Sequence, residues 1–307
     1  MIEKLQTFLQ NRIKMIDKRL IFILLIISQF TFSQIKGIVK DSISGEPIPY
    51  VNIWVENENI GTTSEEDGTF TINANEDKKL VFSALGYENK TVSLSEGNKV
   101  VLKQKEIQLK EVVLQSRKET KEIEIGNSEK IHHKQLSGDK PWIYAKLFPF
   151  KQEYGDTPFV KKIIFYSDSE INNAKIKIRI FEFNDTIPTE DMLQEDLIIS
   201  VKKGMRKNKI DVEKHNIRFP EKGIVIGLEW LIIDENKFDF EYKDFKSNNT
   251  IKVTSYAPSF ILNYFDEDNS FSYSGGKWSR RKRVDSKNNK PWDNELMTPA
   301  INLILSN

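Results

Sequence analysis

The first candidate for chemistry in this chain is a carboxylate beside a tryptophan. Glu229 precedes Trp230 near the end of an apolar run. Burial can raise the pKa of a carboxyl group until it acts as a general acid, and an indole ring can support a sugar. Glycoside hydrolysis also needs a second carboxylate about 5 to 10 Å away, which the sequence cannot place. A structural, hydrogen-bonded Glu at the rim of a sheet is the simpler interpretation.

The second candidate is a basic segment, residues 277–283, in which cations surround one tryptophan. Arginine makes bidentate contacts with carboxylates and phosphates, and tryptophan stacks on flat groups. The segment could therefore bind an acidic polysaccharide, a lipid phosphate or a carboxylate, and the alternative is a solvated loop. The candidate ligand-binding residues of the chain are Glu229, Trp230, Trp278, Arg280, Arg281 and Arg283.

The third candidate is an acidic group, Asp266, Glu267 and Asp268, which offers hard oxygen ligands suited to calcium. It lacks the regular ligand spacing of an EF-hand, so a hairpin turn is the competing interpretation. We otherwise expect no cofactor.

The histidines and cysteines limit the enzymes that the chain can be. A zinc site of the carboxypeptidase class needs two His and one Glu, but the three histidines here are the adjacent pair His132 and His133 and the distant His215. The chain has no cysteine, which excludes disulfides and thiolate catalysis. We therefore expect a protein that is not an enzyme, with a glycoside hydrolase or peptidase as the alternative.

Length and charge point to a globular protein of about two domains. The chain has 307 residues, of which 38% are hydrophobic. Its 46 Lys and Arg nearly balance its 45 Asp and Glu, so the broad positive field of a nucleic-acid-binding protein is not expected.

The N-terminus has the pattern of a secretory signal peptide. Lys18 and Arg19 precede an apolar run at 20–27, and small residues follow up to Ser33. The run is shorter than the roughly 20 residues that span a bilayer. We expect residues 1–33 to be removed, with Met15 as a second candidate start and a retained anchor as the alternative. The mature protein would then have no transmembrane span and would be periplasmic, held at the outer-membrane surface, or secreted.

The next part of the chain alternates like short β-strands. Val51 and Ile53, Phe70 and Ile72, and later pairs recur with a period of two, separated by turn residues. Gly45 and Pro47 are expected to turn the chain, and Asp67–Gly68 to close a hairpin before Phe70. This pattern is typical of a small antiparallel sandwich.

Several of these segments, in this order, resemble one family. They are "IKGIVKD" from Ile35, "SGEPIPYVNI", "GTTSEEDGTF", "LVFSALGYE" and "LKEVVL" ending at Leu114. The succession resembles the carboxypeptidase-regulatory-like domain, a transthyretin-like β-sandwich of Bacteroidota envelope proteins. The resemblance implies such a sandwich at residues 34–114 and no catalysis. The family's module also precedes TonB-dependent outer-membrane receptors, but about 190 residues follow here, too few for a plug and a large barrel.

The remaining chain is expected to form a linker and a second all-β domain. Residues 115–141 read as a solvated linker or an exposed edge strand, and residues 142–307 as a β-sandwich, jelly-roll-like domain. Lys175, Lys177 and Arg179 alternate with isoleucines, which predicts a strand with one buried and one basic face. After Pro188, residues 189–193 favour a helical turn. This second half looks like an unassigned region found beside the regulatory-like domain in other envelope proteins, and that likeness implies no site residues.

The sequence therefore predicts a non-catalytic exported envelope protein that binds a glycan, a peptide or a partner protein. The alternatives are an accessory or assembly factor of a TonB-dependent outer-membrane uptake system, and a hydrolase with its carboxylates in the second domain.

Overall fold

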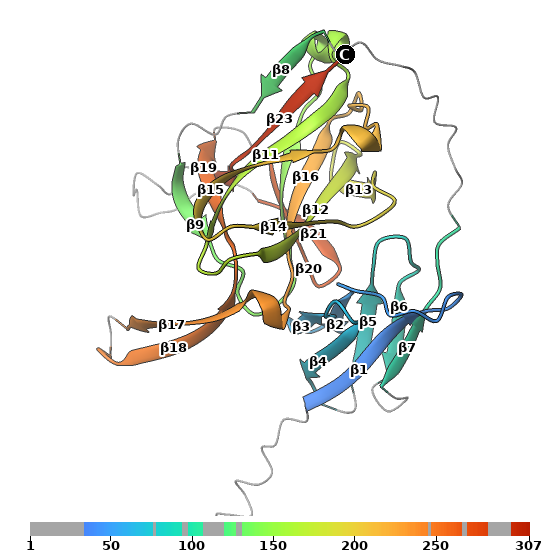
Figure 1. Ribbon diagram of the computed structural model, residues 1–307, viewed down its shortest axis with the longest axis vertical. Helices are drawn as coiled ribbons and strands as arrows, with labels where there is room; N and C mark the ends of the chain where they lie inside the picture. The colour runs from blue at the N-terminus through green and yellow to red at the C-terminus, as the bar shows by residue number, and fades with distance from the viewer. Residues whose placement is uncertain are drawn as a thin grey trace, which may run out of the picture.

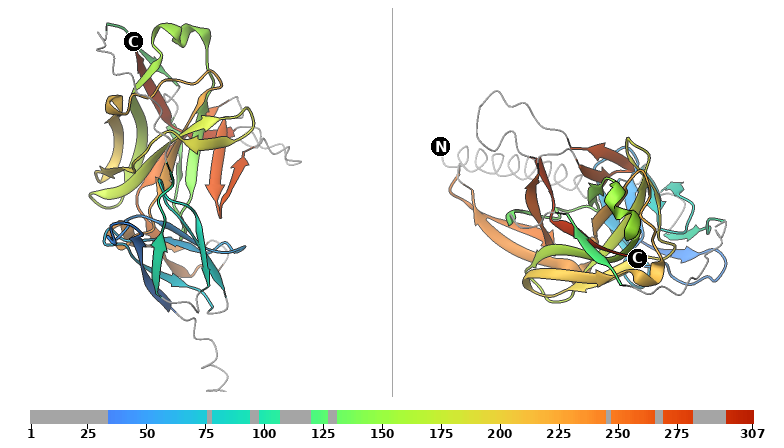
Figure 2. Two further views of the ribbon diagram at one scale, coloured as in Figure 1. Left: turned by 90° about the vertical axis from the view of Figure 1, so that its right-hand side faces the viewer. Right: turned by 90° about the horizontal axis from the view of Figure 1, so that it is seen from above.

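The computed structural model describes residues 34–75, 78–93, 98–106, 120–126, 131–244, 247–265, 269–281 and 296–307. The expected signal peptide, residues 1–33, lies outside these residues. The described chain is nearly all β and forms two sandwich domains, as the sequence predicts. The N-terminal domain, blue to teal in the figures, packs against one end of the second domain (Figures 1 and 2). Among the described residues, none of the helices has the length and apolar character of a transmembrane helix.

The N-terminal domain consists of two small sheets, ordered β4-β1-β7 and β3-β2-β5-β6. Its strands are β1 (Gln34–Asp41), β2 (Asn52–Val55), β3 (Gly61–Thr63), β4 (Thr69–Asn73), β5 (Lys79–Ser83), β6 (Lys90–Ser93) and β7 (Lys99–Leu102). Alternate apolar residues of both sheets form one core, in which the rings of Phe70 and Phe82 meet edge to face at 5.5 Å. This arrangement confirms the predicted small sandwich, but β1 and β7 pair in parallel, so the expectation of a wholly antiparallel one is wrong.

The turns of this domain follow the expected chemistry. Gly45 and Gly68 have φ angles of 71° and 74°, in the left-handed region that glycine adopts without steric cost. The Asp67 carboxylate accepts a hydrogen bond of 2.9 Å from the backbone N–H of Thr69, which closes the hairpin before Phe70. Val51 and Ile53 are fully buried.

The second domain consists of two antiparallel sheets of seven strands each. The first sheet has the order β13-β12-β16-β10-β20-β21, with β14 also beside β12; the second has the order β22-β19-β11-β23-β8, with β15 beside β11 and β9 beside β19. Their strands are β8 (Glu122–Ile125), β9 (Ile131–Gln135), β10 (Ile143–Phe148), β11 (Phe159–Ser169), β12 (Ala174–Phe183), β13 (Pro188–Asp191), β14 (Leu197–Val201), β15 (Gly204–Asp211), β16 (Ile224–Trp230), β19 (Ser259–Phe265), β20 (Ser270–Ser274), β21 (Lys277–Arg280), β22 (Leu296–Pro299) and β23 (Ile301–Ser306).

One apolar core lies between these two sheets. Ile176, Ile178 and Trp230 contribute from the first sheet, and Phe165 and Leu303 from the second. The strands are therefore hydrophobic on their inward positions, the pattern that a face-to-face sandwich requires. Trp230 stacks on Trp142 at 4.3 Å between ring centroids, and its indole N–H donates to the carbonyl of Pro258.

The expected linker, 115–141, contains two strands of the second domain. β8 pairs with β23, and β9 pairs with β19, so this domain begins before residue 142. At β8 the edge-strand alternative is the one that the structure adopts. The reason is that Ile123 and Ile125 pack on the core and alternate with the exposed Glu122 and Glu124, so four residues suffice to extend the sheet.

Residues 189–193 do not form the expected helical turn. β13 pairs with β12 instead, and the Asp191 carboxylate accepts a hydrogen bond of 2.8 Å from the backbone N–H of Leu193. An acidic residue that caps a helix can equally close a turn at the end of a strand, because both motifs use the same hydrogen bond.

The remaining elements in the described part of the chain are a ribbon and three short 3₁₀ turns. Among the described strands, β17 (Lys237–Lys243) and β18 (Thr250–Tyr256) pair only with each other, and they project from the second domain near the N-terminal domain (Figure 1). The 3₁₀ turns are η3 (Gln152–Asp156), η4 (Glu213–His215) and η5 (Asp234–Asn236).

Candidate functional site at the domain interface

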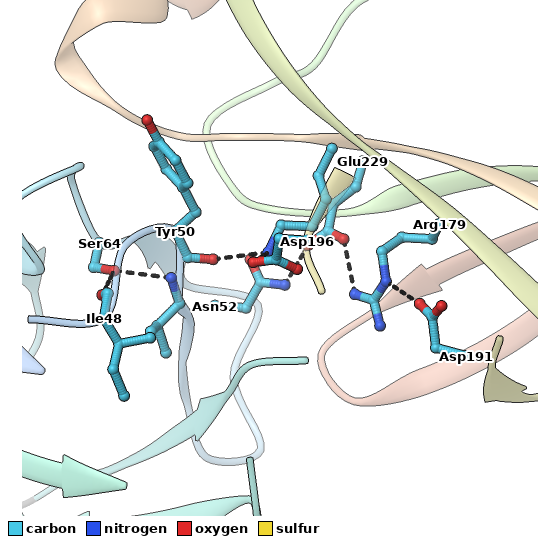
Figure 3. A network of polar contacts seen from close by, with 10 residues as sticks. Ile48, Tyr50, Asn52, Ser64, Arg179, Asp191, Asp196 and Glu229 are labelled. Carbon is cyan, nitrogen blue, oxygen red and sulfur yellow. Dashed lines mark hydrogen bonds and ion pairs between the residues drawn. The ribbon is translucent and has the colours of Figure 1, made fainter. Parts of the chain in front are cut away.

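The loop that precedes β2 presents Tyr50 to the second domain. Tyr50 has a φ of 55°, which an aromatic residue seldom adopts. The hydroxyl of Ser64 holds this conformation, because it accepts a hydrogen bond of 2.8 Å from the Val51 N–H and donates one of 3.1 Å to the Ile48 carbonyl (Figure 3). The hydroxyl of Ser64, in the segment "GTTSEEDGTF", thus hydrogen-bonds to the backbone of the segment "SGEPIPYVNI", which contains Tyr50 and Asn52. These bonds lie where the two domains meet.

The basic face of β12 meets this loop. The Lys175 ammonium donates to the Tyr50 hydroxyl at 3.1 Å and lies 2.9 Å from a Glu66 carboxylate oxygen and 2.8 Å from one of Glu235. The hydrogen bonds that this ammonium donates to Glu235, Glu66 and the Tyr50 hydroxyl raise the pKa of Lys175, so it stays charged. The Lys177 ammonium, almost fully buried, donates to the Tyr50 carbonyl at 3.1 Å and pairs with Asp196 at 2.8 Å.

The third cation of this face, Arg179, lies between two buried carboxylates. Its Nη1 is 3.0 Å from an oxygen of Glu229, and its Nε donates to Asp191 (Figure 3). The side-chain amide of Asn52, from the N-terminal domain, donates to the other oxygen of Glu229. Glu229 therefore has partners from both domains.

The charge state of Glu229 follows from these neighbours. Burial alone would raise the pKa of this carboxyl group, but Arg179, Lys177 and the Asn52 amide outweigh it and lower the pKa below its ordinary value. At Asp191, which shares the same guanidinium, burial prevails and raises the pKa. Glu229 is therefore held as an anion, whereas a general acid must carry a proton.

Further contacts extend the interface beyond these charges. Thr63 accepts from the Ile232 N–H at 3.1 Å, and Glu65 accepts from the Asp234 N–H at 2.9 Å. Tyr50 also packs with Leu231 and Ile233 in a separate apolar cluster. The interface combines a compensated charge network with apolar packing, so it is suited to fixing one domain on the other.

The structure places the predicted ligand-binding residues in different surroundings. Glu229 and Trp278 lie in one row across the outer face of the first sheet, through the register pairs Trp278–Tyr273, Tyr273–Ile143 and Ile143–Glu229. Three strand spacings separate them, about 14 Å. Glu229 is covered by the N-terminal domain, whereas Trp278 is half-buried. Trp230 belongs to the opposite, inner face of the sheet.

The basic segment is likewise divided between the outer and inner faces of the first sheet. Trp278 packs against Phe181 and Tyr273, each at 5.1 Å between ring centroids, and the exposed Arg280 lies 5.5 Å from the Phe271 ring on that face. Arg281 lies over the ring of Tyr144, which belongs to the inner core. Arg283 is outside the described residues. Trp278 and Arg280 are thus the predicted pair that shares one surface.

The candidate metal ligands are dispersed or outside the described residues. Asp266, Glu267 and Asp268 fall outside them, and the described part contains no group of three His, Asp or Glu arranged to hold a metal. His133 lies on the edge strand β9, while His215 lies in η4, where burial lowers its pKa. The calcium site remains an expectation.

Sequence reasoning did not identify the interface residues Tyr50, Asn52, Lys177, Arg179 and Asp191 as a site. Two signals were present: three cations at alternate positions of one strand, and polar or aromatic residues alternating with Val51 and Ile53. A strand with a charged face is usually solvated, so its pairing with the other domain could be found only from the three-dimensional arrangement.

Comparisons with known proteins bear on the N-terminal domain. Residues 35–114 match the CarboxypepD_reg-like domain family. The TonB-dependent receptor SusC of Bacteroides thetaiotaomicron is 35% identical over 80 residues, which are 26% of this chain and 8% of that receptor. The chain thus matches only a small part of the receptor's length. A solved clostridial cysteine protease, Cwp84 after propeptide cleavage, aligns over 84% of this chain and 65% of its own at 10% identity, with a TM-score of 0.35. The family match agrees with the two-sheet fold of β1 to β7, and the N-terminal domain of this chain is therefore a CarboxypepD_reg-like domain.

Proposed function

We propose that this chain is a non-catalytic exported envelope protein that acts as a binding or interaction module, with its CarboxypepD_reg-like domain fixed on the second sandwich. The ligand or partner, a glycan, a peptide or a protein, would contact the β20–β21 hairpin, where Trp278 and Arg280 share one face. The envelope assignment rests on the family of the N-terminal domain and on the signal-like N-terminus.

The observation that carries this proposal is that Arg179 and Asn52 engage the buried, negatively charged carboxylate of Glu229. This carboxylate was the leading candidate for a catalytic acid, and its oxygens are engaged by Arg179 and Asn52 inside the interface. Hydrolysis would need a proton on a group whose pKa is lowered and water at a site that is fully buried. Binding makes neither demand, because it needs only a surface with fixed polar and aromatic groups.

The test combines binding and turnover on residues 34–307, which contain all the described structure. Glycan and peptide arrays should identify a ligand, and Arg280→Ala should weaken its binding by about tenfold or more, as expected for a lost hydrogen bond to a charged group. Arg218→Ala, which removes another exposed arginine, is the matched control and should leave binding unchanged.

Chromogenic glycosides and peptides are assayed in parallel, and we expect no turnover. Turnover that disappears in Glu229→Gln but persists in Glu182→Gln, an exposed carboxylate of β12, would establish the hydrolase instead. If no array ligand is found and Arg280→Ala behaves as wild type in every assay, the binding surface is not at this hairpin.

A second candidate function is favoured by the likeness to SusC, which is a TonB-dependent receptor. In this case the chain would be an accessory or assembly factor of such an uptake system. A tagged chain should then retain a receptor barrel during purification from outer membranes. Ile43→Asp, at a side chain of the N-terminal domain that is 79% exposed, tests whether this domain makes the contact. Equal recovery with Ile43→Asp would place the contact elsewhere, and no recovery with wild type would remove this candidate.

A further inference from the structure

The turn between β14 and β15 and the strand that follows hold an unusual density of positive charge. Five of the eight residues from Lys202 to Lys209 are cations, namely Lys202, Lys203, Arg206, Lys207 and Lys209. All five are exposed, and none forms an ion pair with any residue that the structure describes. The net charge of the whole chain is only +1, so this concentration is local.

The cations project on both sides of one free sheet edge. β15 pairs with β11 along one side, and no described strand lies along its other side. Arg206 is opposite Ser167, on the sandwich side of the sheet, whereas Lys207 and Lys209 are opposite Tyr166 and Ile164 on the outer side. What the five cations share is therefore the edge itself. Figure 1 places β15 on the second domain, above the N-terminal domain, and the left view of Figure 2 shows the second domain above the N-terminal one in the same way.

The carboxylates on these strands are already engaged. Asp168, opposite Met205, pairs with Lys134, and Asp211 accepts a hydrogen bond of 3.0 Å from the Glu213 N–H. Glu170, in the turn next to Gly204, is a single exposed carboxylate beside five cations. None of the five cations is therefore neutralised by a described carboxylate, and Lys207, which lies 5.7 Å from the centre of the Tyr166 ring, is still exposed to an anion from outside the chain. Met205 stands among them with 49% of its surface exposed, so the edge offers an apolar side chain as well as charge.

We propose that the β14–β15 edge docks on an anionic phospholipid surface. A flat surface contacts cations on both sides of a strand edge at once, whereas a linear polyanion lying along one face meets only Lys207 and Lys209. Clusters of four to eight Lys or Arg bind anionic head groups, with about fivefold in affinity for each cation. Met205 inserts among the head groups and acyl chains, where its exposed apolar surface leaves water.

The experiment measures co-sedimentation of residues 34–307 with vesicles of phosphatidylglycerol and phosphatidylethanolamine in roughly equal amounts, and with phosphatidylcholine vesicles. We expect binding to the anionic vesicles only, weakened as salt screens the charges. Lys207→Gln with Lys209→Gln should reduce binding about 25-fold. Met205→Ser should cause a smaller loss that salt does not alter.

The matched control removes two exposed lysines of the β17 ribbon, Lys237→Gln with Lys243→Gln, and should bind like wild type. Equal binding by the β15 variant and wild type, or equal binding to neutral and anionic vesicles, would overturn the proposal. Binding to a soluble acidic polysaccharide instead of vesicles, lost in the β15 variant, would overturn it in favour of a linear polyanion. Binding to neither would show that the cations only protect the edge from other strands.

Discussion

The strands β12 and β15 both carry clustered cations, and the structure uses them in opposite ways. On β12, Lys175, Lys177 and Arg179 each have a carboxylate or carbonyl partner, and two of these partners belong to the other domain. On β15, Arg206, Lys207 and Lys209 are exposed and form no ion pair with the described residues. The same residue types on the same kind of element therefore hold two domains together in one place and face solvent in the other.

Burial decides which role a cation takes. A buried charge is tolerated only with a close partner of opposite charge or a hydrogen-bond acceptor. The folded structure therefore depends on the pairing of the β12 cations with their partners. An exposed charge needs no partner and contributes little to folding, so the β15 cations remain available to an external ligand. Removing charges from the two strands should therefore have very different effects on stability.

The largest expected effect is that of Arg179→Met. The substitution leaves Glu229 and Asp191 buried without their shared guanidinium, which should lower the free energy of unfolding by about 3 to 5 kcal/mol. Urea unfolding followed by tryptophan fluorescence measures this change, and Arg206→Met on β15 is the control. Similar stabilities of the two variants would contradict the contrast between the strands.

Lys146 sharpens the comparison because it is a cation inside the sandwich core. Its ammonium donates to the Ile301 carbonyl at 2.8 Å, and burial lowers its pKa from 10.5 to about 8. Between these values the unfolded chain binds more protons than the folded one, so the free energy of unfolding rises with pH. The titration of Lys146 should therefore increase the free energy of unfolding by about 3 kcal/mol in total as the pH rises through this range.

The measurement is the stability difference between wild type and Lys146→Met from roughly pH 7 to 11. The difference should shift in favour of wild type as the pH rises and the lysine loses its proton. The comparison with Lys146→Met cancels the titration of exposed groups. A difference that stays constant across this range would mean that burial does not perturb Lys146.

Asn52→Ala tests the part of the β12 network that crosses the domain interface. It removes the amide that donates to Glu229 and should cost about 1 to 3 kcal/mol, the range for a buried group left unsatisfied. Urea unfolding followed by tryptophan fluorescence, to which Trp54 in β2 contributes from the N-terminal domain, should begin at a lower urea concentration than in wild type. An unchanged transition would mean that Asn52 contributes nothing to docking.

The smallest expected effect is that of Lys207→Gln with Lys209→Gln. Both side chains are exposed, so the free energy of unfolding should change by less than about 0.5 kcal/mol. Thermal unfolding measures it, and the same protein serves in the vesicle experiment. A large loss of stability would show that these lysines have a structural role, as the cations of β12 do.

Most of the fold could be predicted because its strands alternate regularly. Val51 and Ile53, and Ile176 and Ile178, were assigned to a core from their spacing, and the structure buries them. β8 and β9 were harder, because residues 122–125 and 131–135 are short and polar and gain their stability from strands far along the chain. The contacts that fix them are not local, so no local pattern reveals them.

The candidate site was less predictable than the fold. Glu229 was singled out as a carboxylate next to a tryptophan, but adjacent residues of a strand point to opposite faces, and Trp230 belongs to the inner core. The hydrogen-bond partners of Glu229 are far from it in the sequence: Arg179 is 50 residues away and Asn52 is 177 residues away. Its environment therefore depends on strand order and domain docking, which the spacing of residues does not encode.

The position of β23 has a consequence for the order in which the protein folds. This strand lies between β11 and β8, and Asn302 donates to Glu124, which precedes it by 178 residues. During synthesis the second sheet cannot close until residues 301–306 have emerged, whereas β1 to β7 are complete about 200 residues earlier. We expect the N-terminal domain to fold first, with Asn52 exposed to solvent. The second domain should fold later and more slowly, because its strand pairings join residues far apart in the sequence. Limited proteolysis of nascent chains stalled at increasing lengths would reveal this interval, as a protease-resistant N-terminal domain that appears before the second domain.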